Sequence, residues 1–547
     1  MRRFAALLDS LAFEPSRNAK LRLMVDYFRT TPDPDRGFAL AALTDSLSFR
    51  YAKPKLIKTL IGDRVDPHLF ALSYDYVGDL SETVALLWPT QDETKSSTNL
   101  SLSTVIRSLM QASNLEQAPL LVGFLNGLDE TGRWALLKLL TGALRVGVSA
   151  RLAKQAVAEF GNRPLAEIED LWHGLSPPYL ELFAWLEGKA EKPESRDPAP
   201  FRSAMLAHAL DEAELANVPI EEFRAEWKWD GIRVQASAGV DAEGRKIVRL
   251  FSRTGEDVSG AFPDLVGEFL RIPVASFAID GELLVVRDGK TQSFGVLQQR
   301  LNRKTVSAKL LAEFPAHIRA YDILLFDGED LRALPFDERR GRLERFIAVA
   351  ESQRLDLSPL VEASSWEALA EARGNPAGVG AADAEAIEGI MLKRADSAYV
   401  GGRPKGLWYK WKRDPATIDA VLMYAQRGHG KRSSLYSDYT FGVWQTIEGG
   451  DALVPVGKAY FGFTDEELRR LDRYVRGHTA NRFGPVREVE HDKSAGLVLE
   501  VAFEGVNRSP RHKSGLAMRF PRINRIRWDK PTHEADRIEM LEALVKD

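Results

Sequence analysis

Through residue 186, apolar side chains recur at spacings of three and four, the pattern of amphipathic helices. The segments ETVALLWP, LLVGFLNGLDETGRWALLKLLTGALRVGVSARLAKQAVAEF and LAEIEDLWHGL show it, with interruptions at Gly, Pro and Asp. The pattern stops at residues 187–202, EGKAEKPESRDPAPFR, which are rich in proline and charge. These features predict an all-α domain over residues 1–200 that ends in a linker.

From residue 203 the apolar positions alternate with polar ones in short runs such as RKIVRLFSR, SFAIDGELLVVRDG and LWYKWKRD. Helical stretches such as DERRGRLERFIAV separate these runs. The alternation predicts an α+β domain built on antiparallel sheets over residues 201–413. After Asp414 and Pro415 the strands continue with one helical insertion, TDEELRRLDRYVRGH, which predicts a small closed β-barrel over residues 414–547.

Composition narrows the class of protein. The chain has 547 residues, too many for one core, and no apolar run approaches the ~18 residues needed to span a bilayer. Asp9 interrupts the apolar start, so we expect no signal peptide. The chain has no cysteine, which excludes disulfides, thiolate zinc sites and cysteine nucleophiles and favours a cytoplasmic protein.

The charge is unevenly distributed. The net charge of −4 means that any binding of nucleic acid relies on local basic patches. One such patch lies at residues 501–530, which hold eight lysines and arginines against two acidic residues, a local net charge of +6.

The stretch EWKWDGIRVQ, residues 226–235, places a lysine between two tryptophans. In a strand, alternation puts the tryptophans on one face and Lys228 on the other, together with Glu226 and Asp230. Asp230 and Gly231 are typical of a β-hairpin turn, in which case Lys228 is a solvated surface residue. The alternative is a reactive lysine, whose neutral amine requires cationic groups or a metal nearby.

Several downstream motifs bear on this choice: SRTG with Arg253, IDGE with Glu282, YDILLFDG with Tyr321, IEGIMLKR with Glu388 and Lys393, WYKWK with Lys410 and Lys412, and RFPRINRIRWDK with Arg519, Arg522 and Lys530. Taken alone, each also fits an ordinary turn, a solvated charge or a core aromatic. In this order they resemble the motif set of covalent nucleotidyltransferases. More closely, the chain resembles ATP-dependent DNA ligases of the bacterial multi-domain type across residues 228–530.

The resemblance extends to the helical domain. LLTGALRVGVSARL, residues 139–152, is similar to a helix-entry stretch in the DNA-binding domain of such ligases, where backbone N–H groups can approach a phosphate. An ordinary Gly-containing helix connection is the alternative. Ligases that use NAD characteristically carry a four-cysteine zinc site, so the lack of cysteine favours ATP.

The resemblance implies a mechanism and a set of site residues. Lys228 is the catalytic nucleophile that attacks the α-phosphate of ATP and carries AMP, which then passes to the 5′-phosphate of a nick before the 3′-hydroxyl seals the strand. The implied nucleotide-binding residues are Glu226, Arg233, Arg253, Glu282, Tyr321, Arg403, Lys410, Lys412, Arg519, Arg522 and Lys530. Glu282 and Glu388 are the implied ligands of Mg²⁺ or Mn²⁺, with Asp230 as a further candidate.

Two details of this set stay open. In GGRPKG either Arg403 or Lys405 could serve the nucleotide, and we favour Arg403. Alternation places Glu388 and Lys393 on opposite faces of one strand, so both reach the site only if the strand ends or bulges between them. The family also implies that the barrel is an OB-fold that closes on the nucleotide, with residues 413–415 as the pivot.

Two other functions remain possible from the sequence. RNA ligation and RNA capping use the same lysine chemistry, but the long helical domain argues against them. A non-catalytic nucleic-acid-binding scaffold needs only the helical domain and the basic patch, and does not require Lys228, Glu282, Glu388 and Lys410 together. As a ligase, the protein is expected to act as a monomer on nicked double-stranded DNA in the bacterial cytoplasm, near the nucleoid, with helicase or nuclease repair partners.

Overall fold

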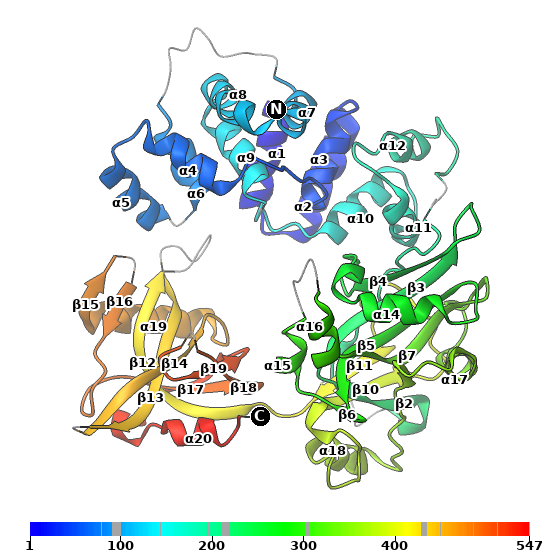
Figure 1. The fold of residues 1–547 in the computed structure, drawn as a ribbon. Coiled ribbons are helices and arrows are strands. Elements are labelled where there is room, and N and C mark those ends of the chain that lie inside the picture. Colours follow the sequence, from blue (N-terminus) through cyan, green and yellow to red (C-terminus); the bar gives the residue numbers. More distant parts are fainter. Residues whose placement is uncertain are drawn as a thin grey trace. The chain divides into compact units, whose positions relative to one another are not determined.

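The computed structural model describes residues 1–545 except 78, 90–99, 143, 194–196, 211–217, 301–305, 428–434, 449, 485 and 511. The chain divides into two compact units, whose elements are labelled in Figure 1. The first contains Met1–Thr291, Arg300–Leu369 and Ile390–Trp411, and the second contains Gln292–Gln299, Ala370–Gly389 and Lys412–Asp547. Two residues of the predicted features lie outside the described residues: Ala143 of the helix-entry stretch at residues 139–152, and Arg511 of the basic patch.

The first unit begins with a helical region, which confirms the prediction of helices before residue 187. Its helices are α1 (Arg2–Phe13), α2 (Arg17–Thr30), α3 (Asp35–Leu43), α4 (Pro54–Gly62), α5 (Pro67–Val77), α6 (Leu80–Leu87), α7 (Leu102–Gln111), α8 (Asn114–Gly127), α9 (Glu130–Thr141), α10 (Ala150–Phe160), α11 (Leu165–Leu171), η2 (Trp172–Gly174) and α12 (Leu180–Leu186). Ser16, Asp79, Ser101, Asp129 and Ser149 cap helix N-termini through their side chains. The helices share one apolar core.

Two sheets form the rest of the first unit. The larger, seven-stranded in the described residues, has the order β4 (Lys246–Ser252), β3 (Ile232–Val240), β5 (Phe277–Arg287), β7 (Ala316–Phe326), β8 (Glu329–Asp330), with β6 (Lys290–Thr291) beside β5 and β9 (Leu355–Leu357) beside β7. The four-stranded sheet has the order β1 (His208–Ala209), β11 (Trp408–Lys412), β10 (Ile387–Arg394), β2 (Phe223–Trp229). The helices between strands are η3 (Ile220–Glu222), η4 (Ser259–Ala261), α14 (Pro263–Leu270), α15 (Phe294–Leu297), α16 (Ala308–Glu313), α17 (Phe336–Ala350), α18 (Trp366–Gly374) and η5 (Ala384–Ala386). Of these, α15, η5 and residues 370–374 of α18 fall in the second unit.

The expected β-hairpin at Asp230 and Gly231 is wrong. Strands β2 and β3 flank this dipeptide but belong to different sheets, so the chain crosses between sheets here instead of folding back. The backbone of Gly231 lies so close to β5 that an added Cβ would stand 2.6 Å from the carbonyl oxygen of Leu283 and 2.8 Å from Cγ of Glu282. Glycine is therefore required by the close approach of two chain segments, not by a hairpin turn.

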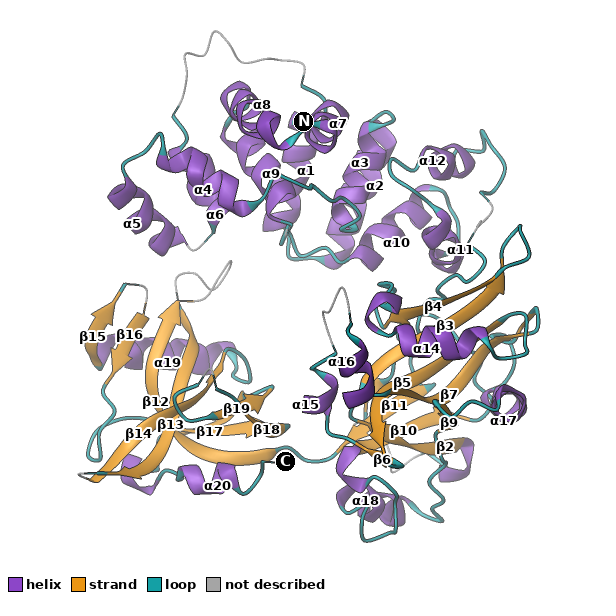
Figure 2. Cartoon of the chain, viewed as in Figure 1, coloured by secondary structure: helices purple, strands orange, loops and turns teal. Residues whose placement is uncertain are grey.

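The second unit is built mainly on one curled antiparallel sheet, seven-stranded in the described residues (Figure 2). Its strands run β14 (Gly450–Ala459), β13 (Tyr436–Ile447), β12 (Ala416–Arg427), β16 (Val486–Val489), β15 (Thr479–Phe483), and β17 (Val498–Phe503) joins β12 to β20 (Arg522–Arg527). β18 (Gly505–Arg508) and β19 (Leu516–Arg519) form a separate pair. The predicted helical insertion is α19 (Asp465–Gly477), and η7 (Thr532–Glu534) and α20 (Ile538–Glu542) follow the last strand.

In the described residues, no helix combines the length and apolar character needed to cross a membrane.

Candidate active site

Lys228 lies near the end of β2, where the chain leaves the four-stranded sheet. Alternation holds around it, because Trp227 and Trp229 are buried whereas Lys228 is half-buried. The strand end is fixed by Trp229, whose Nε1 donates a 3.0 Å hydrogen bond to Oγ of Ser358. Lys228 thus projects from a rigid strand end that is only partly exposed to solvent.

Glu226, two residues before Lys228, is buried between two cations. Its Oε2 lies 2.6 Å from Nζ of Lys393, and its Oε1 lies 2.9 Å from Nη1 of Arg340. Burial raises the pKa of the Glu226 carboxyl, and the two cations partly offset this rise. Burial likewise lowers the pKa of the Lys393 ammonium against the opposing effect of Glu226. The predicted role of Glu226 in nucleotide binding therefore involves a carboxylate that already has two partners.

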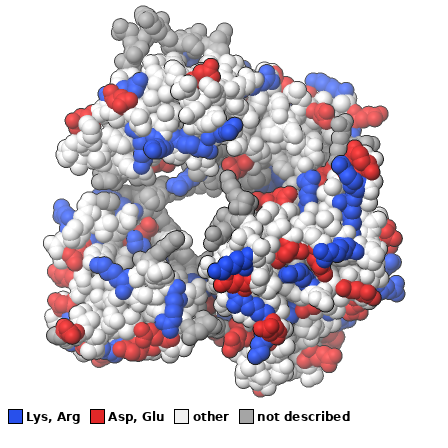
Figure 3. Space-filling model, viewed as in Figure 1, with Lys and Arg blue, Asp and Glu red and all other residues white. Residues whose placement is uncertain are grey.

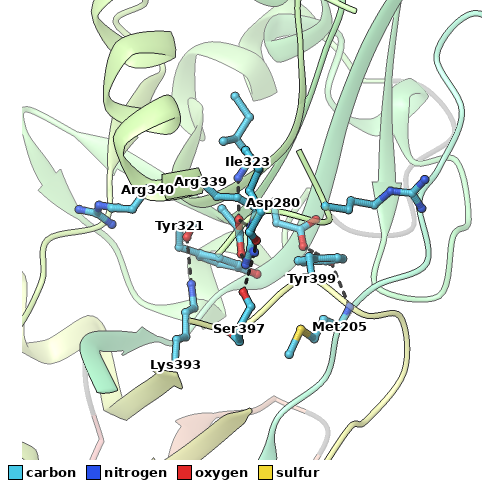
Figure 4. Close-up of polar contacts among 12 residues, drawn as sticks. Met205, Asp280, Tyr321, Ile323, Arg339, Arg340, Lys393, Ser397 and Tyr399 are labelled. Atoms are coloured by element: carbon cyan, nitrogen blue, oxygen red, sulfur yellow. Dashed lines mark hydrogen bonds and ion pairs between the residues drawn. The ribbon is translucent and has the colours of Figure 1, made fainter. Parts of the chain in front are cut away.

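Lys393 joins the strand of Lys228 to the strand of Tyr321. Its Nζ donates a 2.9 Å hydrogen bond to the carbonyl oxygen of Tyr321, on β7 of the other sheet, and lies 4.6 Å from the centre of the tyrosine ring. Figure 4 shows Lys393 pointing toward Tyr321. This buried contact joins the two sheets beside Glu226 of β2 and Tyr321 of β7.

Arg233 is engaged in a buried polar network on the larger sheet. Its Nη2 lies 2.6 Å from Oδ2 of Asp280 and donates a 3.0 Å hydrogen bond to the hydroxyl of Tyr399. Figure 4 shows Asp280 and Tyr399 side by side, joined by a further hydrogen bond. The guanidinium also lies 5.9 Å from the centre of the Tyr321 ring. The carboxylate of Asp280 thus balances a large part of the positive charge of Arg233, one of the predicted nucleotide-binding residues.

Several predicted site residues lie close enough to Arg253 to affect its pKa. Burial lowers the pKa of its guanidinium, and the positive charges of Arg233 and Arg403 lower it further, whereas Tyr321 and Glu282 act in the opposite direction. Glu282 is the register partner of Arg233 across β3 and β5 and lies beside the backbone of Gly231. The structure therefore brings Arg233, Arg253, Glu282, Tyr321 and Arg403 to one part of the first unit.

Lys410 and Lys412 both lie on β11, as the motif predicted. Nζ of Lys412 lies 3.3 Å from Oε2 of Glu388 and 2.9 Å from Oε2 of Glu504. Burial alone would lower the pKa of Lys412, but these two carboxylates outweigh it and raise the pKa. A lysine paired with two carboxylates contributes little to lowering the pKa of another lysine, so Lys412 is a weak source of the cationic surroundings that a reactive lysine requires.

The three basic residues predicted on the barrel have separate surroundings in the second unit. Arg519 ends β19, and its guanidinium lies 4.7 Å from the centre of the Phe294 ring. Arg522 begins β20 opposite Ala502 of β17. Nζ of Lys530 lies 2.7 Å from Oδ2 of Asp419. Lys530 therefore has an ion-pair partner within its own unit.

The described part of the chain contains no group of three or more His, Cys, Asp or Glu residues that could hold a metal ion. Magnesium is commonly bound by one or two carboxylates, with water and substrate phosphates completing the shell. Glu282 and Glu388 are each half-buried, and both have the hard oxygen ligands that this mode of binding requires.

Three family matches cover most of the chain. Residues 1–158 match "DNA ligase N terminus", residues 204–412 match "ATP dependent DNA ligase domain" and residues 432–530 match "ATP dependent DNA ligase C terminal region". The "Probable DNA ligase" of Koribacter versatilis is 36% identical over 440 residues, which cover 75% of this chain and 71% of that protein. The chain belongs to the ATP-dependent DNA ligase family. The resemblance seen in the motifs is thereby confirmed.

Other relatives of this ligase agree. The "Probable DNA ligase" of Anaeromyxobacter sp. is 34% identical and covers 79% of this chain and 80% of its own, and the "DNA ligase" of Archaeoglobus fulgidus is 31% identical and covers 75% and 71%. The solved structure titled "Pmar-Lig_PreS3" is similar in fold, with a TM-score of 0.59 and 16% identity over 96% of this chain and 99% of that one. The protein is an enzyme that uses ATP to seal nicks in DNA, and these matches do not favour RNA ligation or capping.

Sequence reasoning missed some residues that shape this site. Lys393 was noted without a role, although a lysine inside the apolar run IMLK must find a carboxylate if the strand is buried. Arg340, Asp280 and Tyr399 gave no local signal at all, because their partners are 114, 47 and 119 residues away along the chain.

Proposed function

We propose that Lys228 is the nucleophile that this ligase adenylates. The neutral Nζ attacks the α-phosphorus of ATP, a P–N bond forms, the P–O bond to pyrophosphate breaks, and the amine proton leaves. The observation that carries the proposal is the position of Lys228 at the end of β2, between the Glu226–Lys393 ion pair and the close approach of Gly231 to Glu282. A rigid strand end suits a displacement that depends on alignment.

The nucleotide is bound, in this proposal, by the predicted site residues together with Lys393. Tyr321 stacks on adenine, Glu226 and Lys393 present polar atoms to its edge, and Glu282 accepts hydrogen bonds from the ribose hydroxyls. Arg233, Arg253 and Arg403 lie toward the phosphates, with Lys410 and Lys412. Arg519, Arg522 and Lys530 orient the pyrophosphate when the C-terminal part closes about residues 413–415.

A divalent cation, Mg²⁺ or Mn²⁺, belongs to the same proposal, with Glu282 and Glu388 as its protein ligands. When bound, it neutralises charge that develops on the phosphate oxygens. Glu388 has to exchange its ion pair with Lys412 for the metal, and Lys412 then reaches a phosphate only if it also leaves Glu504, which lies 2.9 Å away.

The later steps require duplex DNA. AMP passes from Lys228 to the 5′-phosphate of the nick, and the 3′-hydroxyl then displaces it. We assign DNA binding to the helical region, residues 1–200. Figure 3 shows basic side chains gathered along the lower edge of this region. Residues 201–413 are the proposed adenylation domain, and residues 414–547 are the proposed OB-fold.

The nucleophile is tested by incubating the protein with α-labelled ATP and Mg²⁺ and then denaturing it. Wild-type protein is expected to retain label, and Lys228→Ala is expected to retain none. Lys309→Ala, which removes an exposed lysine on α16, is the matched control and should retain label as the wild type does. A labelled adduct of normal yield in Lys228→Ala contradicts the assignment.

A further inference from the structure

Two turns of the first unit carry arginines that we assign to the nucleotide. One follows β4 and has the sequence SRTG, residues 252–255, with Arg253. The other has the sequence GGR, residues 401–403, with Arg403. Both turns contact the C-terminal end of the helical region and the segment that follows it, which is far from them in sequence.

Arg151, in the first turn of α10, binds the second of these turns. Its Nη2 donates a 3.2 Å hydrogen bond to the carbonyl oxygen of Gly401, and its Nε is held by Oε1 of Glu169 at 2.9 Å. The guanidinium lies directly on Gly402, where an added Cβ would stand 1.9 Å from Nη1. Gly402 also has a φ of +93°, so both the backbone conformation and the contact require glycine.

His173, in η2, packs against the first turn. Its ring centre lies 5.3 Å from that of Phe201 and 5.4 Å from that of Phe251, the penultimate residue of β4. Gly255, with a φ of +86°, sits on this aromatic group: an added Cβ would stand 2.9 Å from Phe201 and 3.2 Å from His173. The SRTG turn thus rests on a surface to which the helical region contributes a side chain.

These contacts oppose an electrostatic cost. Burial lowers the pKa of Arg253, and the positive charges of Arg233 and Arg403 lower it further, so these two arginines repel Arg253. Three cations held close together before a polyphosphate binds repel one another, so the turns that carry two of them need support from elsewhere. Arg151 and His173 provide contacts of this kind.

We infer that Arg151 and His173 are positioning residues for adenylation: they hold the turns that present Arg403 and Arg253 to ATP, so the helical region contributes to the first chemical step as well as to DNA binding. The inference rests on the proposed roles of Arg253 and Arg403.

The test measures self-adenylation without DNA as a function of ATP concentration. Arg151→Ala is expected to raise the ATP concentration for half-maximal rate by about tenfold, because a misplaced phosphate-binding group costs one to two orders of magnitude. Arg151→Lys keeps the charge but cannot span Glu169 and Gly401, and should be impaired to a similar degree. Arg332→Ala is the matched control: it removes ion pairs with Asp170 of α11 at 2.9 Å and with Asp330 at 2.7 Å, neither of which lies in the two turns, and should change the value less than about twofold.

A double-mutant cycle separates positioning from a general structural effect. If Arg151 acts through Arg403, then adding Arg151→Ala to Arg403→Ala has less than about a twofold further effect. Two effects that multiply, or a normal response in Arg151→Ala beside an impaired Arg403→Ala, overturn the inference and leave the role of Arg403 intact. A normal response in Arg403→Ala itself overturns the proposed role of that residue and the inference with it. His173→Ala with Arg253→Ala gives the same comparison for the other turn.

Discussion

At the residue scale, the site depends on buried charged residues whose partners are far away along the sequence. Lys228 was predicted correctly as a lysine on the polar face of a strand. The ordered motifs downstream of it indicated the ATP-dependent DNA ligase family. The pairing of Glu226 with Lys393 and Arg340 could not be predicted, since the partners are 167 and 114 positions away and only tertiary packing joins them. The role of Glu226 at adenine therefore stays a prediction, now with two supporting cations.

His173 makes the stability of the folded protein depend on pH. Burial lowers its pKa to about 4, helped by the positive charges of Lys154 and Arg249 and opposed by Asp197 and Asp257, whereas an unfolded histidine has a pKa of ~6.5. Between these values the unfolded chain binds the proton and the folded one does not, so stability falls as the pH drops from 6.5 toward 4 and is unaffected by this group above 6.5.

Urea unfolding at pH 7.5 and pH 4.5 measures this effect. The wild type is expected to lose about 2 kcal/mol more than His173→Gln over this interval, because glutamine stays neutral throughout. Equal losses in the two proteins contradict the prediction.

At the element scale, alternation identified the strands but not their partners. The runs at residues 226–235 were correctly seen as strand, yet Asp-Gly signalled a hairpin where the chain instead crosses between sheets. Turn signals are local, and the choice between folding back and crossing is made by packing against β5, which begins 46 residues after Gly231. The strand of Lys228 is consequently positioned by both sheets.

Gly231→Ala tests the importance of this crossing. The added methyl group meets the backbone of Leu283, so the chain must shift between Lys228 and Glu282, and self-adenylation should fall by about 100-fold. Gly267→Ala in α14 is the control, because an added Cβ there contacts nothing within 4 Å and alanine favours a helix. An unchanged adenylation rate in Gly231→Ala shows that the crossing does not position the nucleophile.

At the scale of the whole molecule, the order of motifs predicted the family because chemistry fixes those residues. The helical region and the antiparallel sheets also followed from periodicity. The predicted domains, residues 1–200, 201–413 and 414–547, stay a prediction; the two compact units of the structure group the chain in another way, since residues 292–299 and 370–389 belong to the second unit. Which segments cluster together depends on packing between distant parts of the chain, and periodicity carries no information on that.

If the C-terminal part closes on the nucleotide, its arginines are needed for self-adenylation and much less for sealing. Replacing Arg519 and Arg522 by alanine should slow self-adenylation by about tenfold or more, since pyrophosphate loses two charged contacts. Sealing of a pre-adenylated nick should change by less than about threefold. Arg525→Ala, on the same strand β20, is the control for loss of charge. Equal losses in both steps count against closure.

Locating the AMP adduct on the chain identifies the nucleophile, which we propose to be Lys228. The protein is incubated with ATP and Mg²⁺ in the absence of DNA, digested under conditions that preserve the phosphoramidate, and its peptides are sequenced by mass spectrometry. AMP is expected on Lys228. AMP on any other residue, with Lys228 unmodified, contradicts the proposal.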